Sequence, residues 1–265
     1  MTSHDVSLLA RSNPINLAKI AVARMLGRDA TVSSDGIKLV IGTHRGEGAV
    51  CALQGREYEE IERFLAVARR LPQGLFFDLG ANVGTYAVRV AAENPHLRVV
   101  AIEALPWNRG RIRCSAGLNG CLVDVPDFGI SDTVGSATIP LQSPGRASVR
   151  APAPKGSITI KTITLDALAA RYAPATLRLL KVDLDGMCME ALTGGLKTVS
   201  RRETIIYFEN DSGASQYLRN LGYKVGSMES GTLSETDIGW ALWAVPPSMI
   251  GLYFLTIASA PEPVR

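Results

Sequence analysis

Two acidic residues, Asp78 and Glu103, each follow a short apolar run, and a glycine-rich turn lies between them. The turn reads Asp78-Leu-Gly-Ala-Asn-Val-Gly84, and its glycines can adopt backbone angles that let a ligand approach the main chain. Glu103 follows the turn by about twenty residues, where an acid binds the ribose hydroxyls of a nucleotide cofactor. The pattern predicts a nucleoside site at the carboxyl edge of a parallel sheet.

The glycine spacing argues against a dinucleotide. A dinucleotide fingerprint is Gly-x-Gly-x-x-Gly, packed to admit a pyrophosphate, whereas this chain has Asp-x-Gly-x-x-x-Gly. A carboxylate before the turn and a ribose acid after it suit a nucleoside without phosphates. A nicotinamide-dependent oxidoreductase remains an alternative, although the chain lacks the third glycine and a Tyr-x-x-x-Lys motif.

A second group of charges lies in the run from Leu179 to Gly186, where Lys181, Asp183 and Asp185 alternate with other residues. Alternation along a strand predicts that all three point to one side. Because unpaired buried charges are costly, they must pair with one another or meet a ligand. The fourth strand of a doubly wound sheet neighbours the first, which favours a functional site over a purely structural ion pair.

A fifth apolar run ends in Glu209-Asn210-Asp211, again at an expected strand end. Asp183, Glu209 and Asn210 would together form an oxygen-rich set suited to a hard cation. The main expectation is a site without a metal, with Mg²⁺ at these three residues as an optional addition.

Alternating strands and helices after residue 71 predict a parallel sheet. The expected strands are 75–79, 98–102, 121–125, 177–183 and 204–209. Upstream, Pro14 and Gly27 bracket an expected basic, amphipathic helix, which packs on the domain or on a partner, with contact to a membrane surface as the alternative. β-like runs follow between 31 and 53, and an amphipathic helix covers 57–71. The division is therefore 1–70, an N-terminal helix, hairpin and cap helix, and 71–265, the main domain. Between 135 and 161 we expect an insertion whose middle, 143–156, is a loop, either a substrate lid or a surface insertion.

The composition excludes several classes of protein. With 46% hydrophobic and 20% charged residues the chain is globular, and a net charge of +3 argues against a nucleic-acid partner. The basic residues Arg109, Arg111 and Arg113 are expected on a solvated surface.

Four cysteines without a Cys-x-x-Cys pair and three scattered histidines predict reduced thiols and a cytoplasmic protein. The N-terminus lacks the pattern of a signal peptide. Residues 238–261 carry no charge, but Pro246-Pro247 interrupts them, so we expect a strand and a short element rather than a membrane partner.

The combined motifs resemble the FkbM family of class I methyltransferases over roughly residues 55–245. The resemblance rests on Tyr58-Glu59, Asp78 to Gly84, Glu103 with Pro106 and Asn108, Asn119, Ile130-Ser131-Asp132 with Gly135, Thr164-Leu165-Asp166, Lys181 to Gly186, Leu192-Thr-Gly194 and Glu209. It implies a Rossmann-like, doubly wound α/β fold with a mostly parallel seven-stranded sheet and a small N-terminal helical/hairpin cap. It also implies S-adenosyl-L-methionine as cofactor and methyl transfer to a hydroxyl of a small-molecule natural product or sugar.

The resemblance implies roles for individual residues. The catalytic candidates are Asp183, Lys181 and Glu209. The cofactor-binding candidates are Asp78, Gly80, Ala81, Asn82, Gly84, Glu103, Ala104, Asn108, Ser131 and Asp183. The expected partner is a hydroxylated small molecule, and the oligomeric state stays open, with a homodimer as one option.

The chain departs from the family pattern Lys-x-Asp-x-Glu-Gly-x-Glu at two positions. Asp185 replaces the first Glu and Cys188 the second, with Glu190 as the nearest substitute carboxylate. The loss at Cys188 leaves a second hypothesis open, a cofactor-binding protein without methyl transfer in a biosynthetic assembly.

Overall fold

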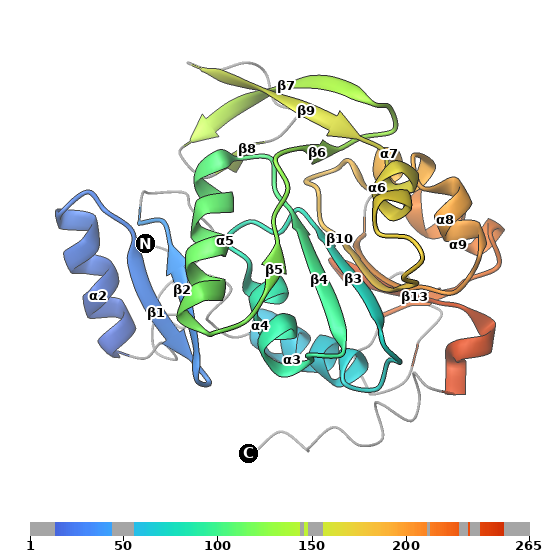
Figure 1. Cartoon of the computed structure of the whole chain (residues 1–265), viewed down its shortest axis with the longest axis horizontal. Helices are drawn as coiled ribbons and strands as arrows, with labels where there is room; N and C mark the ends of the chain where they lie inside the picture. Colours follow the sequence, from blue (N-terminus) through green and yellow to red (C-terminus); the bar gives the residue numbers. More distant parts are fainter. Residues whose placement is uncertain are drawn as a thin grey trace.

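A seven-stranded sheet forms the centre of the molecule, which a computed structural model describes at residues 14–43, 56–143, 146–147, 156–210, 213–227, 233 and 239–251. Six of its strands run parallel, and the seventh is antiparallel to its neighbours. In spatial order they are β12 (Lys224–Gly226), β13 (Ala241–Val245), β11 (Ile205–Glu209), β10 (Leu177–Val182), β3 (Gly74–Leu79), β4 (Leu97–Ile102) and β5 (Val123–Asp124). This arrangement confirms the doubly wound, mostly parallel sheet expected from the sequence (Figure 1).

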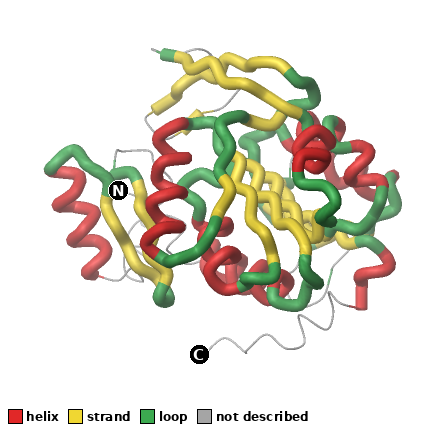
Figure 2. Tube along the Cα trace, viewed as in Figure 1, coloured by secondary structure: helices red, strands yellow, loops and turns green. Residues whose placement is uncertain are grey.

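Helices cover both faces of this sheet, as Figure 2 shows. One face packs against α3 (Arg56–Ala68), α4 (Thr85–Glu93) and α5 (Pro106–Leu118). The other packs against α6 (Leu165–Arg171), α7 (Cys188–Thr193), α8 (Leu196–Ser200) and α9 (Ala214–Asn220). Because both faces are covered, the central strands are almost continuously apolar, which is why the sequence revealed them.

Alternation along the strands divides the buried side chains between two apolar clusters. In β3, Phe76 belongs to the cluster under α3 and α4, whereas Phe77 and Leu79 belong to the cluster under α6 to α9. Asp78 therefore faces the α3 and α4 side. The five predicted strands are all present, although the third is only Val123–Asp124 long.

The insertion after β5 is more ordered than the sequence suggested. It contains a second sheet of four strands in the order β6 (Gly129–Ile130), β9 (Ser157–Ile163), β7 (Gly135–Ser143) and β8 (Arg146–Ala147). β7 and β9 form an antiparallel ladder from Gly135↔Thr162 to Pro140↔Ser157. β9 is rich in Ile and Thr, which favour strands, but the Pro- and Gly-rich stretch before it predicts a loop. Most of the predicted 143–156 loop lies outside the described residues.

An N-terminal cap precedes the main sheet. Helix α2 (Pro14–Met25) packs on a two-stranded hairpin, β1 (Ala30–Ser34) and β2 (Ile37–Ile41), and the hairpin packs on α5 (Figure 1). The hairpin and its helix match the expected cap, and the apolar cluster under α4 continues into them through Ile20 and Leu39.

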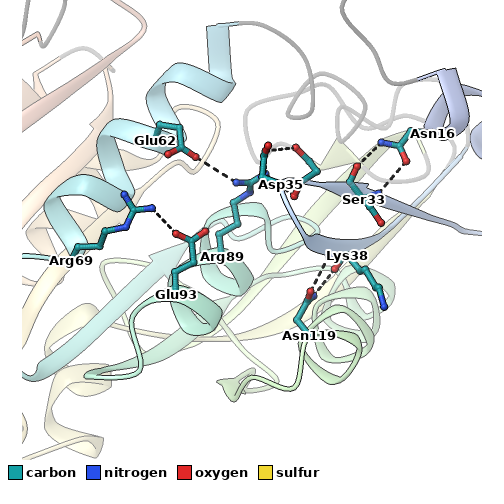
Figure 3. Close-up of polar contacts among 10 residues, drawn as sticks. Asn16, Ser33, Asp35, Lys38, Glu62, Arg69, Arg89, Glu93 and Asn119 are labelled. Atoms are coloured by element: carbon teal, nitrogen blue, oxygen red, sulfur yellow. Dashed lines mark hydrogen bonds and ion pairs between the residues drawn. The ribbon is translucent and has the colours of Figure 1, made fainter. Parts of the chain in front are cut away.

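Polar contacts fix the cap to the main domain (Figure 3). Arg89 of α4 is 2% exposed, and its guanidinium lies 3.1 Å from the Asp35 carboxylate and 3.6 Å from that of Glu62. Asn119, after α5, accepts a hydrogen bond from the Lys38 amide at 2.9 Å and donates one to the Lys38 carbonyl at 2.6 Å. The Asn119 side chain therefore pairs with the edge of β2 as another strand would.

In the described part of the uncharged stretch near the C-terminus, residues 239–251 contain β13 and a short 3₁₀ helix, η2 (Pro247–Met249). Across the described ranges, no helix combines the length and the apolar character needed to cross a bilayer.

Candidate functional site

Polar side chains of three neighbouring strands form a row on the α3 and α4 face of the sheet. Lys181 of β10 is in register with Asp78 of β3 on one side and with Tyr207 of β11 on the other. All three residues are buried, with exposed fractions of 2%, 0% and 3%. The predicted adjacency of the first and fourth strands therefore brings two of the candidate site residues, Asp78 and Lys181, into contact.

Lys181 is held between two carboxylates. Its Nζ lies 2.9 Å from Oδ2 of Asp183 and 3.5 Å from Oδ1 of Asp78. Burial alone would lower the pKa of Lys181, but the charges of Asp183 and Asp78 outweigh it and raise the pKa above its ordinary range. Burial raises the pKa of Asp78, against the attraction of Lys181. Lys181 is therefore a fixed cation and not a base at neutral pH.

Only one member of this charged group opens to the surface. The side chain of Asp183 is 38% exposed, compared with 3% for Lys181 and 1% for Asp78. Asp78 uses its other carboxylate oxygen to accept a hydrogen bond from the Ala87 amide, in the first turn of α4. A ligand above the strand ends would thus meet Asp183, with Lys181 and Asp78 beneath it.

Aromatic residues that the sequence did not single out enclose Lys181. Its Nζ lies 5.0 Å from the centre of the Tyr86 ring, and Tyr207 donates a hydrogen bond to Glu60 of α3 at 3.0 Å. Burial raises the pKa of the Tyr207 hydroxyl well above its ordinary value. In the sequence, the one signal for Tyr207 as a site residue is a hydroxyl group within an otherwise apolar strand. No local pattern identifies Glu60 as its partner.

The glycine turn packs against the chain itself. Gly80 and Gly84 have positive φ angles of 80° and 88°. A Cβ at Gly80 would overlap the carbonyl oxygen of Asp183, and one at Gly84 would lie 3.0 Å from the side chain of Ile112. Gly80 therefore allows close approach between the ends of β3 and β10, a packing role that the ligand-based reading of the sequence did not include.

Glu103 is fixed at the same edge by main-chain donors. Its two carboxylate oxygens accept hydrogen bonds from the amides of Asn82 and Leu105, each at 2.8 Å. Burial raises the pKa of Glu103 to about 7, despite these hydrogen bonds. Asn82 itself has a φ of 52°, a left-handed conformation that Asn tolerates better than most residues. The turn after β3 and the acid after β4 are thus one connected unit.

Asn108 and two arginines extend this unit. Asn108 donates to the side chain of Asn82 at 3.3 Å and accepts from Arg111 at 2.8 Å. Arg111 also binds Asp29 through two hydrogen bonds of 3.0 and 2.7 Å. Arg109 donates to the carbonyls of Glu103 and Ala104 at 3.1 and 3.0 Å. The expectation that Arg109 and Arg111 lie on a solvated surface is wrong, because the two residues are only 9% and 7% exposed.

Comparison with known proteins identifies this architecture. The Methyltransferase FkbM domain matches residues 78–225, more than half of the 265 residues. The chain belongs to the FkbM methyltransferase family. The matched segment begins at Asp78 and includes the glycine turn, Glu103, Lys181 and Asp183, so the expected family membership is confirmed.

Individual relatives of this FkbM protein are distant. It is 36% identical over 61 residues to the AMB antimetabolite synthetase AmbE of Pseudomonas aeruginosa, a match covering 23% of this chain and 3% of AmbE. The FkbM methyltransferase structure from Methylobacillus flagellatus matches with a TM-score of 0.44 and 14% identity, over 65% of this chain and 43% of that one. A Pyrococcus abyssi tRNA (uracil-54, C5)-methyltransferase in complex with S-adenosyl-L-homocysteine matches with a TM-score of 0.46 and 12% identity, over 82% of this chain and 43% of that one.

The two departures from the FkbM pattern, Asp185 and Cys188, lie beyond the end of β10. β10 ends at Val182, and Asp185 is an exposed turn residue with a φ of 49°, so it does not continue the alternation expected for Lys181, Asp183 and Asp185. Cys188 is fully buried at the start of α7, and its thiol lies 3.6 Å from the carbonyl oxygen of Val182. It belongs to the apolar cluster on the opposite face of the sheet from Lys181.

Several FkbM motif residues have structural roles. Thr164 caps α6 by accepting a hydrogen bond from the Ala167 amide at 3.1 Å. Asp166 accepts hydrogen bonds from the amides of Lys197 and Thr198 at 3.1 and 2.8 Å, at the start of α8. A Cβ at Gly194 would lie 2.7 Å from the carbonyl oxygen of Ser131. These residues secure the face of the sheet opposite α4.

The remaining site candidates are dispersed. Glu209 ends β11 on the side of Tyr207, and Asn210 binds the Gly239 carbonyl at 3.1 Å. The polar contacts of Ser131 are with Ile163 and Asp132 rather than with the glycine turn. Within the ranges given above, no three His, Cys, Asp or Glu side chains are placed to hold a metal ion, so the optional Mg²⁺ gains no support. Ala81 is buried within the turn, and Ala104 follows Glu103 at partial exposure.

Proposed function

We propose that this FkbM protein is an S-adenosyl-L-methionine-dependent O-methyltransferase acting on a hydroxyl of a small-molecule natural product or sugar. The observation that carries the proposal is Asp183, the solvent-facing member of a buried charged group beside the glycine turn. Family membership supports methyl transfer, and the match to a segment of an antimetabolite synthetase supports a role in natural-product biosynthesis.

The residues of the turn fit an adenosyl cofactor. Glu103 ends β4 beside the turn after β3, the position where an acid accepts the hydroxyls of a ribose. The exposed end of the turn offers the side chain of Asn82, which Asn108 orients, while the Asn82 amide holds the Glu103 carboxylate. When bound, the cofactor supplies a methyl group on a sulfonium sulfur. Asp78 is buried beneath the site and does not reach solvent. It accepts a hydrogen bond from α4 and forms an ion pair with Lys181, so its role is to position these elements.

The charged group of Asp78, Lys181 and Asp183 supplies the polar side chains for the reaction. With the cofactor bound, methyl transfer would require the substrate hydroxyl to be aligned with the methyl group, so positioning would be the main contribution of the protein. Asp183 accepts the hydroxyl proton as general base. Lys181 holds the Asp183 carboxylate at 2.9 Å and so fixes the oxygen that receives the proton. Glu209, at the end of the next strand, is the second candidate for this role.

The test combines binding with turnover. Calorimetry with S-adenosyl-L-homocysteine should show binding to the natural chain, and Glu103→Gln should weaken it by at least about tenfold, because one ionic hydrogen bond to a ribose hydroxyl is lost. Glu203→Gln, an exposed acid at the opposite edge of the sheet, is the control and should bind normally. Transfer of labelled methyl to hydroxylated acceptors then tests the reaction.

Binding without transfer to any acceptor would favour the second hypothesis of a non-catalytic cofactor-binding protein. Tight NADH binding in place of S-adenosyl-L-homocysteine would favour an oxidoreductase. Loss of activity with a chelator and its recovery with Mg²⁺ would revive the metal at Asp183, Glu209 and Asn210. Each outcome is distinct from the one that supports an O-methyltransferase.

A further inference from the structure

Helix α2 uses one face to bind the hairpin of the cap. Asn16, Ile20 and Ala23 are buried on this face. Asn16 donates to the Ser33 carbonyl at 2.7 Å and accepts from the Ser33 amide at 3.1 Å (Figure 3). Arg24, at the end of the helix, donates to the Thr43 carbonyl at 2.7 Å. The orientation of α2 on the domain is therefore fixed.

The opposite face of α2 is also apolar, although it faces solvent. Its large side chains are Ile15, Val22 and Met25, which are 63%, 53% and 86% exposed. Leu26, 59% exposed, directly follows the helix, and its amide continues the helical hydrogen bonding to the Val22 carbonyl. Spacings of three, four and seven residues put them on one side of a helix, and the exposed Ala18 and Ala21 lie between them. A helix that is apolar all round is normally covered on both sides. In Figure 1, α2 is the outermost element of the cap, with its far side away from the domain.

Basic residues border this apolar face. The segment from Pro14 to Arg28 contains Lys19, Arg24 and Arg28 and no acidic residue. The next acid, Asp29, is engaged by Arg111 through two hydrogen bonds. Lys19 and Arg28 are exposed, so their charges are available at the margin of the face. An apolar stripe with cationic margins complements a surface that is apolar below and anionic above.

We propose that the outward face of α2, defined by Ile15, Val22, Met25 and Leu26 with Lys19 and Arg28 at its margin, docks on the surface of an anionic lipid membrane. The apolar side chains enter the boundary between headgroups and acyl chains, and the basic side chains meet the lipid phosphates. With twelve residues α2 lies along the surface and does not span it. From the sequence, packing on the domain or on a partner is the expected role of this helix and membrane-surface contact the alternative, which its exposed apolar face now favours. This docking is independent of the proposed methyl transfer.

A second copy of the chain is the less favourable occupant. In a two-fold symmetric contact the same patch meets itself, so the interface would bring together two sets of the cations Lys19 and Arg28. No acid between Pro14 and Arg28 is present to pair with them. The charge at the margin therefore selects an anionic surface over self-association.

The test is flotation of the full chain with lipid vesicles. The chain should float with vesicles of mixed phosphatidylcholine and phosphatidylglycerol and much less with phosphatidylcholine alone, and high salt should weaken the binding. The double variant Val22→Glu/Met25→Glu should lower the bound fraction by at least about tenfold. Leu122→Glu is the matched control, since Leu122 is 92% exposed, lies outside the cap and should bind like the natural chain. Lys19→Gln/Arg28→Gln should reduce binding to the anionic vesicles only.

Thermal unfolding of each variant shows whether the fold is kept. If Val22→Glu/Met25→Glu does not fold, the double variant Val22→Gln/Met25→Gln is used in its place. Absence of natural-chain binding to anionic vesicles overturns the proposal, as does equal binding by the double variant. A dimer in free solution that Val22→Glu/Met25→Glu dissociates, without vesicle binding, would overturn it in favour of a second copy.

Discussion

The α-carbon of Gly80 faces the main-chain carbonyl of Asp183 so closely that a methyl group on Gly80 would overlap the carbonyl oxygen. The Asp183 amide also donates to the carbonyl of Leu79 at 3.0 Å, one residue before Gly80. The turn that begins the cofactor site and the acid proposed as general base are thus fixed to each other through the main chain. Their relative position does not depend on a flexible side chain.

Gly80→Ala tests this contact against a matched glycine. Both Gly80 and Gly36 have a φ of +80°, but Gly36 has nothing within 4 Å of an added Cβ. Gly36→Ala should cost about 1–2 kcal/mol for the left-handed backbone alone. Gly80→Ala adds a clash with backbone and should cost more than about 3 kcal/mol or prevent folding. Urea unfolding measures both, and equal losses would refute the packing role.

Lys181→Met should destabilise the protein by about 3–5 kcal/mol, because it leaves the fully buried Asp78 without its ion-pair partner. Asp78→Asn in the same chain should recover much of this loss, since the amide oxygen can still accept from the Ala87 amide. Arg63→Met removes a surface pair with Glu59 and should cost less than about 1 kcal/mol. Denaturant unfolding of the three variants provides the comparison. A loss at Lys181 as small as that at Arg63 would contradict this account.

The sequence predicted the sheet well because its signals are local. Buried parallel strands give continuous apolar runs, and the charged residues near their ends stand out, which located Asp78, Glu103 and Lys181 together. The β7 and β9 ladder was missed because a Pro- and Gly-rich stretch separates its strands, so their pairing depends on contacts across more than ten residues. Arg109 and Arg111 were misplaced because their ion-pair partners, Asp127 and Asp29, lie in other segments and have no local signature.

The site itself was only partly predictable. Strand alternation correctly placed Lys181 beside Asp183, yet it failed at Asp185 because β10 ends at Val182 and the chain turns there. The same alternation could not show that Cys188 packs on the opposite face. Contacts such as Tyr207 with Glu60 join residues far apart in sequence and have no local signature.

Asp183→Asn should lower turnover by about 10²–10⁴-fold while leaving the affinity for S-adenosyl-L-homocysteine unchanged. The amide keeps the shape of the carboxylate but cannot accept the substrate proton. Asp185→Asn is the control, because Asp185 is an exposed residue in a left-handed conformation that Asn adopts readily. Calorimetry and labelled-methyl transfer separate the two effects. Loss of cofactor binding in Asp183→Asn would show that Asp183 binds the cofactor, and would contradict its role as general base for the acceptor hydroxyl.

Asn119→Asp should destabilise the attachment of the cap by about 1–3 kcal/mol. Oδ1 can still accept from the Lys38 amide, but the second carboxylate oxygen would face the Lys38 carbonyl, which now receives a hydrogen bond from Nδ2 at 2.6 Å. Lys38→Gln changes only a side chain outside this pairing and should be neutral. Hydrogen exchange at the Lys38 amide reports the local opening. Unchanged protection in Asn119→Asp would show that apolar packing alone holds the cap.

Glu103 should make stability and cofactor affinity depend on pH in opposite directions. Its folded-state pKa of about 7 lies above the ordinary 4.5, so the folded chain retains the proton longer than the unfolded chain. The contribution to stability is therefore fully present below pH 4.5 and is lost as pH rises through about 7, a change of about 3 kcal/mol. The ionised carboxylate is the form that accepts both ribose hydroxyls, so affinity for S-adenosyl-L-homocysteine should rise over the same range.

Glu103→Gln carries no titrating proton, and unfolding free energies from pH 5 to 8 should show its stability increasing relative to the natural chain. Parallel stability curves for the two chains would show that Glu103 titrates at its ordinary pKa.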